Sequence, residues 1–125
     1  PGLHVLNADA VSVITHFVRP ATLERVFLLY PNPYPKARQA NQRWYNSPFL
    51  NELRRKMRPG ARLQLATNLE WYAREAEHAL VAEWGFELTQ TRELGTADRP
   101  RTHFEKKYLA RGERCFDLLF TLPVT

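Results

Sequence analysis

The sequence contains few of the features that mark secreted, membrane or metal-binding proteins. Its 125 residues include one cysteine, Cys115, which excludes an internal disulfide framework and a zinc site built from several cysteines. No apolar run approaches the roughly 18 residues that span a bilayer, and no signal peptide is visible. His4, His16 and His78 lack the spacing of metal ligands. We therefore expect a cytoplasmic protein that binds no metal and no membrane.

The charge is positive overall but unevenly distributed. The chain carries 18 Lys and Arg residues against 13 Asp and Glu, a formal charge of +5. Residues 36–62 and 99–114 are rich in basic side chains, whereas residues 63–98 are rich in acidic ones. Two basic segments favour a polyanionic partner, although solvated helix faces give the same pattern. Aromatic rings in or beside these segments suit the stacking of unpaired RNA bases. These rings are Tyr30, Tyr34, Trp44, Tyr45, Phe104 and Tyr108.

The hydropathy pattern of residues 1–125 predicts a single α/β domain in which strands and helices alternate. The expected strands are Leu3–Leu6, Arg25–Tyr30, Arg62–Ala66, Phe86–Arg92 and Cys115–Leu122. The expected helices are Ala10–Val18, Pro48–Met57 and Glu70–Trp84, the last capped by Thr67 or Asn68. We expect a tight turn at residues 58–60 and a polar loop at residues 93–114. This order indicates a mostly parallel sheet whose last two strands pair antiparallel.

Ligands of such sheets bind beyond the carboxyl ends of the strands, where this chain places three polar segments. They are Asn7–Asp9, Pro31–Arg38 and Thr67–Asn68. Asp9 is able to accept hydrogen bonds from an amino group of a ligand, but an aspartate after a strand is as often a helix cap. Asn68 has the same two interpretations.

The segment after the second expected strand is rich in proline. The three prolines of Pro31–Pro35 remove three backbone donors and restrict the loop, which lowers the entropic cost of positioning a ligand. Asn32 offers the acceptor and donor that grip a purine edge, and Tyr34 offers a ring to stack on its face. The positive side chains of Lys36 and Arg38 are suited to bind phosphate groups. The alternative is a plain turn whose asparagine satisfies only backbone groups.

A second group of polar side chains lies in the basic segment near the carboxyl terminus. Thr102, His103, Phe104 and Glu105 bring together a hydroxyl, an imidazole, a ring and a carboxylate. Long loops in compact domains are often functional, so this group is a second candidate for ligand binding. Cys115 lies in an apolar strand and is expected to belong to the core.

Four short segments, taken in order, match one known pattern. Tyr30–Arg38, with Arg43 after it, matches F-P-D-P-W-x-K-x-R-H, and Ala66–Ala73 matches A-T-D-W-x-x-Y-A. Arg99–Glu105 matches R-P-x-T-K-F-E, and Phe116–Phe120 matches W-D-L-x-F. The chain therefore resembles the tRNA (guanine-N7-)-methyltransferase family. Each motif alone is a weak signal, but four in the same order and rough spacing are specific.

The resemblance implies a Rossmann-like class I methyltransferase sheet, S-adenosyl-L-methionine as the methyl donor and tRNA as the partner, with guanine N7 as the methylated atom. By position it implies that Asp9 binds the donor and that Asn32, the catalytic position, lies between donor and substrate. The positions that it assigns to substrate binding are Lys36, Asn68, Thr102, His103, Phe104 and Glu105. The basic segments add Arg38, Arg43, Lys106 and Lys107 as expected RNA contacts.

Three residues depart from the family's pattern. Asn32 and Asn68 stand where the family has Asp, and His103 stands where it has Lys. Guanine N7 carries a lone pair and no proton, so its methylation needs no strong base. The methylated purine is positively charged, however, and a carboxylate stabilises that charge better than an amide. Two alternatives therefore stay open: a methyltransferase for an amine or another RNA base, and a catalytically weak paralogue that binds RNA.

The chain also lacks two elements with which the family holds the donor. No Gly-rich turn follows a first strand, and no acid for the donor's ribose follows a second one. In the family both lie upstream of the matched segments. We therefore expect the C-terminal portion of a methyltransferase catalytic domain, lacking the first two strands of the sheet. The sequence leaves open whether the protein is a monomer or a homodimer.

Overall fold

The computed structural model describes residues 10–96 and 98–124, which form an α/β fold with one four-stranded mixed sheet. The strands are β1 (Leu23–Leu29), β2 (Met57–Thr67), β3 (Glu87–Leu94) and β4 (Cys115–Thr121). The helices are α1 (Ala10–Phe17), α2 (Phe49–Lys56), α3 (Glu70–Ala82) and α4 (His103–Ala110). Two 3-10 helices, η1 (Ala37–Gln42) and η2 (Trp44–Asn46), precede α2. None of the described helices is long and apolar enough to cross a membrane.

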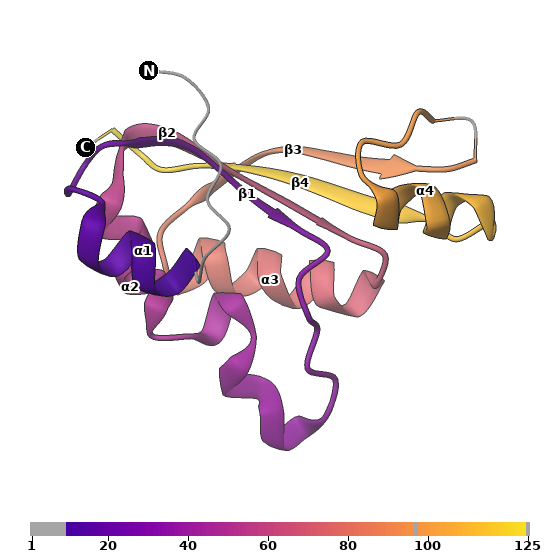
Figure 1. Ribbon diagram of the computed structural model, residues 1–125, viewed down its shortest axis with the longest axis horizontal. Coiled ribbons are helices and arrows are strands. Elements are labelled where there is room, and N and C mark those ends of the chain that lie inside the picture. Colours follow the sequence, from indigo (N-terminus) through magenta and orange to yellow (C-terminus); the bar gives the residue numbers. More distant parts are fainter. Residues whose placement is uncertain (1–9, 97, 125) are drawn as a thin grey trace.

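The strand order in the sheet is β1-β2-β4-β3. β1 and β2 pair in parallel, whereas β4 lies between β2 and β3 and is antiparallel to both. Three strands therefore run in one direction and β4 runs in the other, which confirms the predicted antiparallel pairing of the last two strands. β1 and β3 form the two edges of the described sheet (Figure 1).

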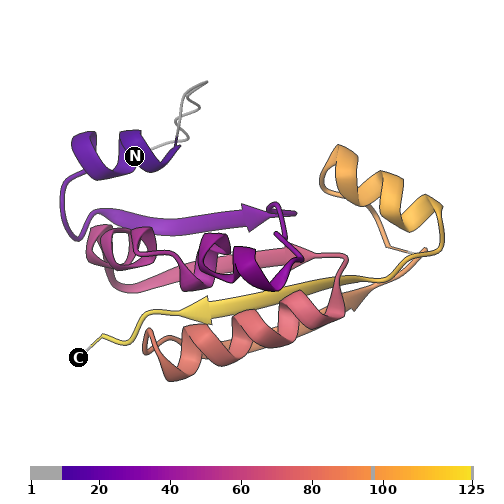
Figure 2. The same cartoon turned by 90° about the horizontal axis from the view of Figure 1, so that it is seen from below.

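Helices α1, α2 and α3 lie on the same side of the sheet (Figures 1 and 2). Leu63 and Leu65 of β2 point to that side and are at most 2% exposed. They pack in one core with Leu53 of α2, Tyr72 of α3 and Phe120 of β4. The two residues that flank Leu63 in β2 are polar, as expected of a strand that buries one face more deeply than the other.

Helix α4 packs at one end of the sheet, in a second and smaller core. Leu109 of α4 packs there with Leu94 and Cys115, and the side chains of Tyr30 and Tyr108 cover them. Cys115 is fully buried, which confirms its predicted place in the core. α4 therefore covers the ends of the strands at which the candidate site residues lie.

The structure corrects two predictions about loops. Residues 93–114, predicted to form a polar loop, contain the end of β3 and helix α4. Residues 58–60, predicted to form a tight turn, lie inside β2. There Gly60 has a φ of +84° and donates its N–H to Leu122 O at 2.8 Å, and the register with β1 shifts. A β-bulge at a glycine thus takes the place of the turn.

The predicted cap of α3 is wrong, and two other predictions fall outside the described residues. Neither Thr67 nor Asn68 caps α3, because Thr67 Oγ1 accepts from Leu69 N at 3.2 Å, one residue before the helix. The predicted strand Leu3–Leu6 and the predicted donor contact Asp9 lie outside the described residues.

Candidate functional site

The polypeptide leaves β1 through a strained loop. Tyr30 and Tyr34 have φ values of +53° and +45°. Bulky residues rarely adopt this region, which costs of order 1–3 kcal/mol per residue. Tyr30 N donates to Ala66 O of β2 at 2.8 Å, and Tyr34 O accepts from Arg43 Nε at 3.1 Å. These hydrogen bonds hold the loop in place at the carboxyl end of β1.

Asn32 is exposed within this loop. Its Oδ1 accepts a hydrogen bond from Tyr34 N at 3.1 Å, an Asx turn that orients the side chain. An amide oxygen has two lone pairs, so one lone pair and both amide hydrogens of Asn32 are still available to a ligand. The catalytic and donor-binding roles of Asn32 stay predictions.

The basic residues that follow the loop differ in exposure. Lys36 and Arg38 are exposed, as a contact with RNA requires. Arg43 is only 7% exposed: its Nη1 lies 2.7 Å from Oε1 of Glu75 in α3, and its guanidinium lies 4.9 Å from the centre of the Trp71 ring. Arg43 therefore fastens the loop to α3, and this burial disfavours the RNA contact that the sequence predicts for it.

Glu105 is the centre of a buried hydrogen-bond network. The residue is 0% exposed. Its Oε1 accepts from N and Nε of Arg101 at 2.9 and 3.2 Å. Its Oε2 accepts from Arg101 Nη2 at 2.8 Å and from the Tyr30 hydroxyl at 2.5 Å. Both carboxylate oxygens are thus engaged within the protein, and Glu105 ties α4 to the end of β1. Its predicted contact with a substrate stays a prediction.

These contacts keep Glu105 charged. Burial raises the pKa of the carboxyl, but hydrogen bonds from Arg101 and Tyr30 outweigh burial and lower the pKa to about 2. The hydrogen bond with Glu105 raises the pKa of the Arg101 guanidinium. Burial, together with the neighbouring Cys115 and Glu105, raises the pKa of the Tyr30 hydroxyl. At neutral pH the network therefore consists of a charged pair and a neutral phenol.

Two residues of the sheet extend this network. Arg101 Nη1 donates to Asp117 Oδ2 of β4 at 3.2 Å. Gln64 Nε2 of β2 donates to the two oxygens of Asp117 at 3.0 and 3.1 Å. The network members Tyr30, Gln64, Arg101 and Asp117 were not among the predicted site residues. Arg101 and Asp117 lie within the third and fourth matched motifs, which is the signal that points to them.

The end of β2 is joined to the same region. Asn68 Nδ2 donates to Glu113 Oε1 at 3.1 Å, and Glu113 lies in the turn between α4 and β4. The segments that follow β1 and β2 and the segment around α4 therefore meet at one end of the sheet (Figure 1). The predicted substrate contact of Asn68 stays a prediction.

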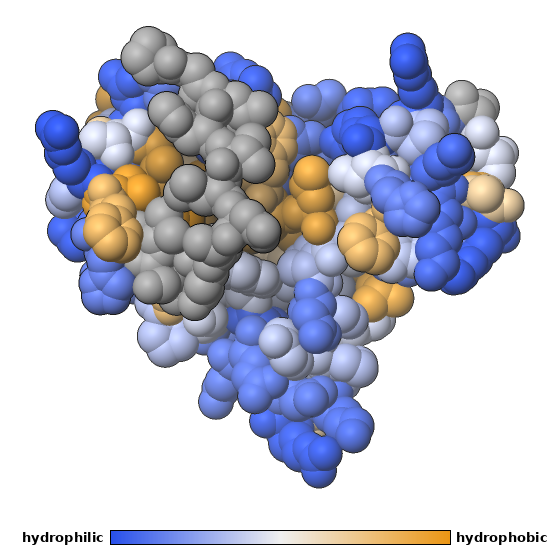
Figure 3. All heavy atoms as spheres, viewed as in Figure 1, coloured by the Kyte–Doolittle hydropathy of each residue, from blue (hydrophilic) through white to orange (hydrophobic). Residues whose placement is uncertain are grey.

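The remaining candidate residues lie at α4. The Thr102 hydroxyl accepts from Glu105 N at 3.0 Å and so caps the helix. His103, Phe104, Lys106 and Lys107 are exposed. In the space-filling view, hydrophilic side chains gather over α4 and over the 3-10 segment that follows the β1 loop (Figure 3). Exposure leaves these residues free to contact a partner, and their ligand roles stay predictions.

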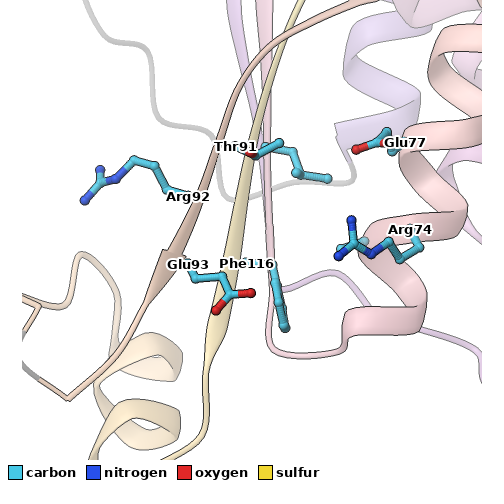
Figure 4. Close-up of a pocket in the computed structure, with 8 residues that line it drawn as sticks. Arg74, Glu77, Thr91, Arg92, Glu93 and Phe116 are labelled. Atoms are coloured by element: carbon cyan, nitrogen blue, oxygen red, sulfur yellow. The ribbon is translucent and has the colours of Figure 1, made fainter.

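A separate hollow lies between α3 and β3, away from these residues. It has a volume of about 120 Å³, and Arg74 and Glu77 of α3 face Thr91 and Glu93 of β3 across it (Figure 4). Charges of both signs line this hollow, which gives it no preference for an anionic or a cationic ligand. Within residues 10–96 and 98–124, no three His, Cys, Asp or Glu side chains are grouped as a metal site requires.

The sequence matches the model of a protein family described as "Putative methyltransferase" over residues 2–118. The chain belongs to this family. It is 34% identical over 121 residues to the tRNA (guanine-N(7)-)-methyltransferase of Burkholderia ambifaria, a match that covers 96% of this chain and 48% of the relative. The protein of the same name from Burkholderia cenocepacia is 34% identical over 119 residues, 94% of this chain and 47% of the relative. The chain thus spans about half the length of the curated relatives it matches.

Solved structures of methyltransferases share the fold. An "antibiotic related Methyltransferase" matches with a TM-score of 0.53 and 16% identity over 82% of this chain and 52% of that chain. A "Putative DNA Modification Methylase" from Thermus thermophilus matches with a TM-score of 0.51 and 18% identity, over 93% and 52%. Its complex with S-adenosyl-L-methionine has a TM-score of 0.50 and 17% identity, over 92% and 53%. The chain is therefore part of a Rossmann-like fold similar to class I methyltransferases.

Proposed function

We propose that this chain is the C-terminal, substrate-facing part of an enzyme that transfers a methyl group from S-adenosyl-L-methionine to guanine N7 of tRNA. Relatives that carry this activity in their names are 34% identical to it. The observation that supports the proposal best is the meeting of the matched motifs at one end of the sheet. Hydrogen bonds from Tyr30 to Glu105 and from Asn68 to Glu113 hold them there. Open α/β sheets bind their ligands at this end of the strands.

The exposed edge of β1 supports a catalytic sheet that continues beyond the described strands. Among the described residues, β1 pairs with β2 alone. Phe27 and Leu29 of β1 are 51% and 37% exposed. A free strand edge is open to pairing with another strand, and Phe27 and Leu29, which alternate with the core-packed Val26 and Leu28, leave part of the opposite face of the sheet uncovered. In the complete enzyme, the first two strands of the methyltransferase sheet are the segments that we place on this side of β1.

The described residues do not fit the methyl donor on their own. Gly60, Gly85, Gly95 and Gly112 each stand singly, so this part of the chain has no Gly-rich turn of the kind that cradles a nucleotide. Asn32 is the described residue that we place at the boundary between donor and guanine. The rest of the donor site therefore belongs to other parts of the complete enzyme.

Contact with tRNA rests on exposed basic residues on both sides of the site. Lys36 and Arg38 follow the β1 loop, and Lys106 and Lys107 lie on α4. Filter binding of tRNA by this chain over a series of salt concentrations tests the contact. Lys36→Ala and the double variant Lys106→Ala/Lys107→Ala should weaken binding and flatten the log–log salt slope by about one for each phosphate that is no longer bound.

A matched control comes from α3. Arg74 is exposed and lines the hollow between α3 and β3, away from the candidate residues, so Arg74→Ala should bind tRNA as the wild type does. Equal affinities and slopes for the wild type and all variants would show that the basic surface is only solvated.

In this proposal Asn32 lies against the guanine as it becomes positively charged. A neutral amide stabilises that charge less than the carboxylate found at this position in the family's motif. Asn32→Asp retains an oxygen acceptor for Tyr34 N, so it changes the charge and preserves the loop. Asn32→Ala removes both the amide group and the oxygen acceptor for Tyr34 N.

Single-turnover methylation of tRNA by the complete gene product, normalised to folded protein, tests this role. Removing one group aimed at developing charge typically changes a rate by roughly a hundredfold or more, so Asn32→Asp should gain part of that, about tenfold, and Asn32→Ala should lose activity. Asn51→Ala on α2 is the matched control, because Asn51 is exposed and lies away from the site. Unchanged turnover in both Asn32 variants would remove Asn32 from the catalytic site.

A further inference from the structure

Tyr30 has an unfavourable backbone conformation two residues before Asn32. Its φ of +53° lies in the left-handed region, which bulky residues rarely adopt. Pro31 follows it, and a residue before a proline favours extended backbone with a negative φ. Such a conformation persists only where surrounding contacts impose it, and it is found most often at functional sites. The contacts that impose it on Tyr30 are therefore candidates for a functional role.

The backbone, the ring and the hydroxyl of Tyr30 each make a contact. The backbone N–H donates to Ala66 O of β2 at 2.8 Å. The ring packs over the smaller core and lies 5.5 Å from the ring of Tyr108. The hydroxyl donates to Oε2 of Glu105 in α4 at 2.5 Å. Phenylalanine would keep the first two contacts, so the hydroxyl contact with α4 is the one that requires tyrosine.

Glu105 is a fixed anchor for this hydroxyl. The carboxylate is fully buried and accepts hydrogen bonds from N, Nε and Nη2 of Arg101 at 2.9, 3.2 and 2.8 Å. Arg101 also donates to Asp117 Oδ2 of β4 at 3.2 Å. A hydrogen bond to an ionised acceptor is roughly twice as strong as one between neutral groups. The Tyr30 hydroxyl therefore joins the end of β1 to a point that both α4 and the sheet hold in place.

Little conformational freedom separates Tyr30 from Asn32. Pro31 lies between them and Pro33 follows Asn32, and each proline ring fixes φ at roughly −65°. The Asn32 side chain is tied to Tyr34 N at 3.1 Å. The direction in which the chain leaves Tyr30 therefore largely determines where Asn32 lies.

We infer that the Tyr30 hydroxyl is a positioning group that sets Asn32 relative to α4. This inference rests on the proposed function, in which Asn32 lies against the guanine. Tyr30 acts through Asn32 and contacts neither donor nor guanine. Without the hydroxyl, the backbone at residue 30 is able to relax toward a negative φ, and Asn32 moves with it. A displacement of about 1 Å at a reacting group costs up to about a hundredfold in rate.

Single-turnover methylation of tRNA by the complete gene product, normalised to folded protein, tests this role with Tyr30→Phe. The rate at saturating tRNA should fall roughly tenfold. The Kd for tRNA should be unchanged, because the hydroxyl is engaged within the protein. Tyr72→Phe is the matched control. It removes a buried hydroxyl that has no hydrogen-bond partner among the described residues, so it should match the wild type.

The double variant Tyr30→Phe/Asn32→Asp tests whether Tyr30 acts through residue 32. In the wild-type background, Asn32→Asp should raise the rate about tenfold. In the Tyr30→Phe background, the same substitution should raise it less than about twofold, because the carboxylate is no longer held at the guanine. A hydroxyl that only stabilises the fold would leave the gain from Asn32→Asp unchanged.

Amide hydrogen exchange of this chain, followed by NMR, measures the loop without relying on activity. In Tyr30→Phe, the N–H of residue 30, which is bonded to Ala66 O, should lose protection. The N–H of Tyr34, which is bonded to Asn32 Oδ1, should lose protection as well. The N–H of Leu65, within β2, should exchange as in the wild type.

The outcomes separate this inference from the proposed function. If Tyr30→Phe matches the wild type in loop exchange and in rate, the inference is refuted. An equal fall in rate with Asn or Asp at position 32 also refutes it, because Tyr30 would then act independently of that residue. If the loop loses protection while the Asn32 variants keep the wild-type turnover, the positioning of the loop stands and the catalytic role proposed for Asn32 fails.

Discussion

Glu105→Gln should destabilise the folded chain most at neutral pH and progressively less in acid. The substitution keeps the shape of the side chain and removes its negative charge. In the wild type, hydrogen bonds from Arg101 and Tyr30 stabilise that charge in a fully buried position. Folding lowers the pKa of Glu105 from 4.5 to about 2. The unfolded chain therefore binds the proton more tightly than the folded one, so the ionised carboxylate stabilises the fold above pH 4.5 and loses that effect as the pH falls toward 2.

The size of the effect follows from the same values. A lowering of the carboxyl pKa by this amount corresponds to roughly 3 kcal/mol of stability at pH 7. Single domains are stable by about 5–15 kcal/mol, so the loss is a large fraction of the total. For a chain of this length we expect a fall in Tm of roughly 10 °C.

Thermal and urea unfolding followed by circular dichroism, at pH 7 and at intervals down to pH 3, measure this difference. Glu52→Gln is the matched control, because Glu52 pairs with Arg55 at 3.1 Å in a solvent-accessible position and should cost less than about 1 kcal/mol. A loss of stability for Glu105→Gln that is equal at pH 7 and pH 3 would refute the electrostatic explanation. It would show that the shape of the side chain, not its charge, holds α4.

Three further outcomes follow from the described contacts. Arg43→Lys should lower the free energy of unfolding by about 1–2 kcal/mol, since lysine cannot bridge Tyr34 O and Glu75 together. The tRNA affinity per folded molecule should be unchanged. Weaker tRNA binding with an unchanged Tm would show that Arg43 contacts RNA. Tyr72→Phe should leave urea stability unchanged or raise it by up to about 1 kcal/mol, because its buried hydroxyl finds no hydrogen-bond partner among the described residues; a large loss would reveal a hidden partner. Titration calorimetry of this chain with S-adenosyl-L-methionine should show weak binding or none, and a micromolar Kd would contradict the incomplete donor site.

Local sequence patterns predicted most of the fold. Apolar runs located β1 and β4, helical spacing located α1, and start and end signals located α2 and α3, because each of these signals is contained within a few turns or one strand. Helix α4 was missed although Thr102 stands three residues before Glu105, the spacing of a capping box. The polar and basic character of residues 93–114 outweighed that short signal.

The candidate site was harder to predict because its contacts are long-range. Tyr30 and Glu105 lie 75 residues apart, and no local pattern reveals that the tyrosine hydroxyl meets that carboxylate. Arg43 was assigned to RNA from the charge of its neighbours, but Glu75, 32 residues away, engages its guanidinium. The order of the four motifs identified the segments that form the candidate site. Only the fold shows which of their residues hold the site together.

The 7-methylguanosine content of total tRNA, measured by mass analysis of nucleosides from cells with and without the gene that encodes this chain, tests the proposed activity most directly. We expect deletion to remove 7-methylguanosine from tRNA, the wild-type gene to restore it, and a gene carrying Asn32→Ala to fail. An unchanged 7-methylguanosine content after deletion would contradict guanine-N7 methylation of tRNA as the activity of this protein.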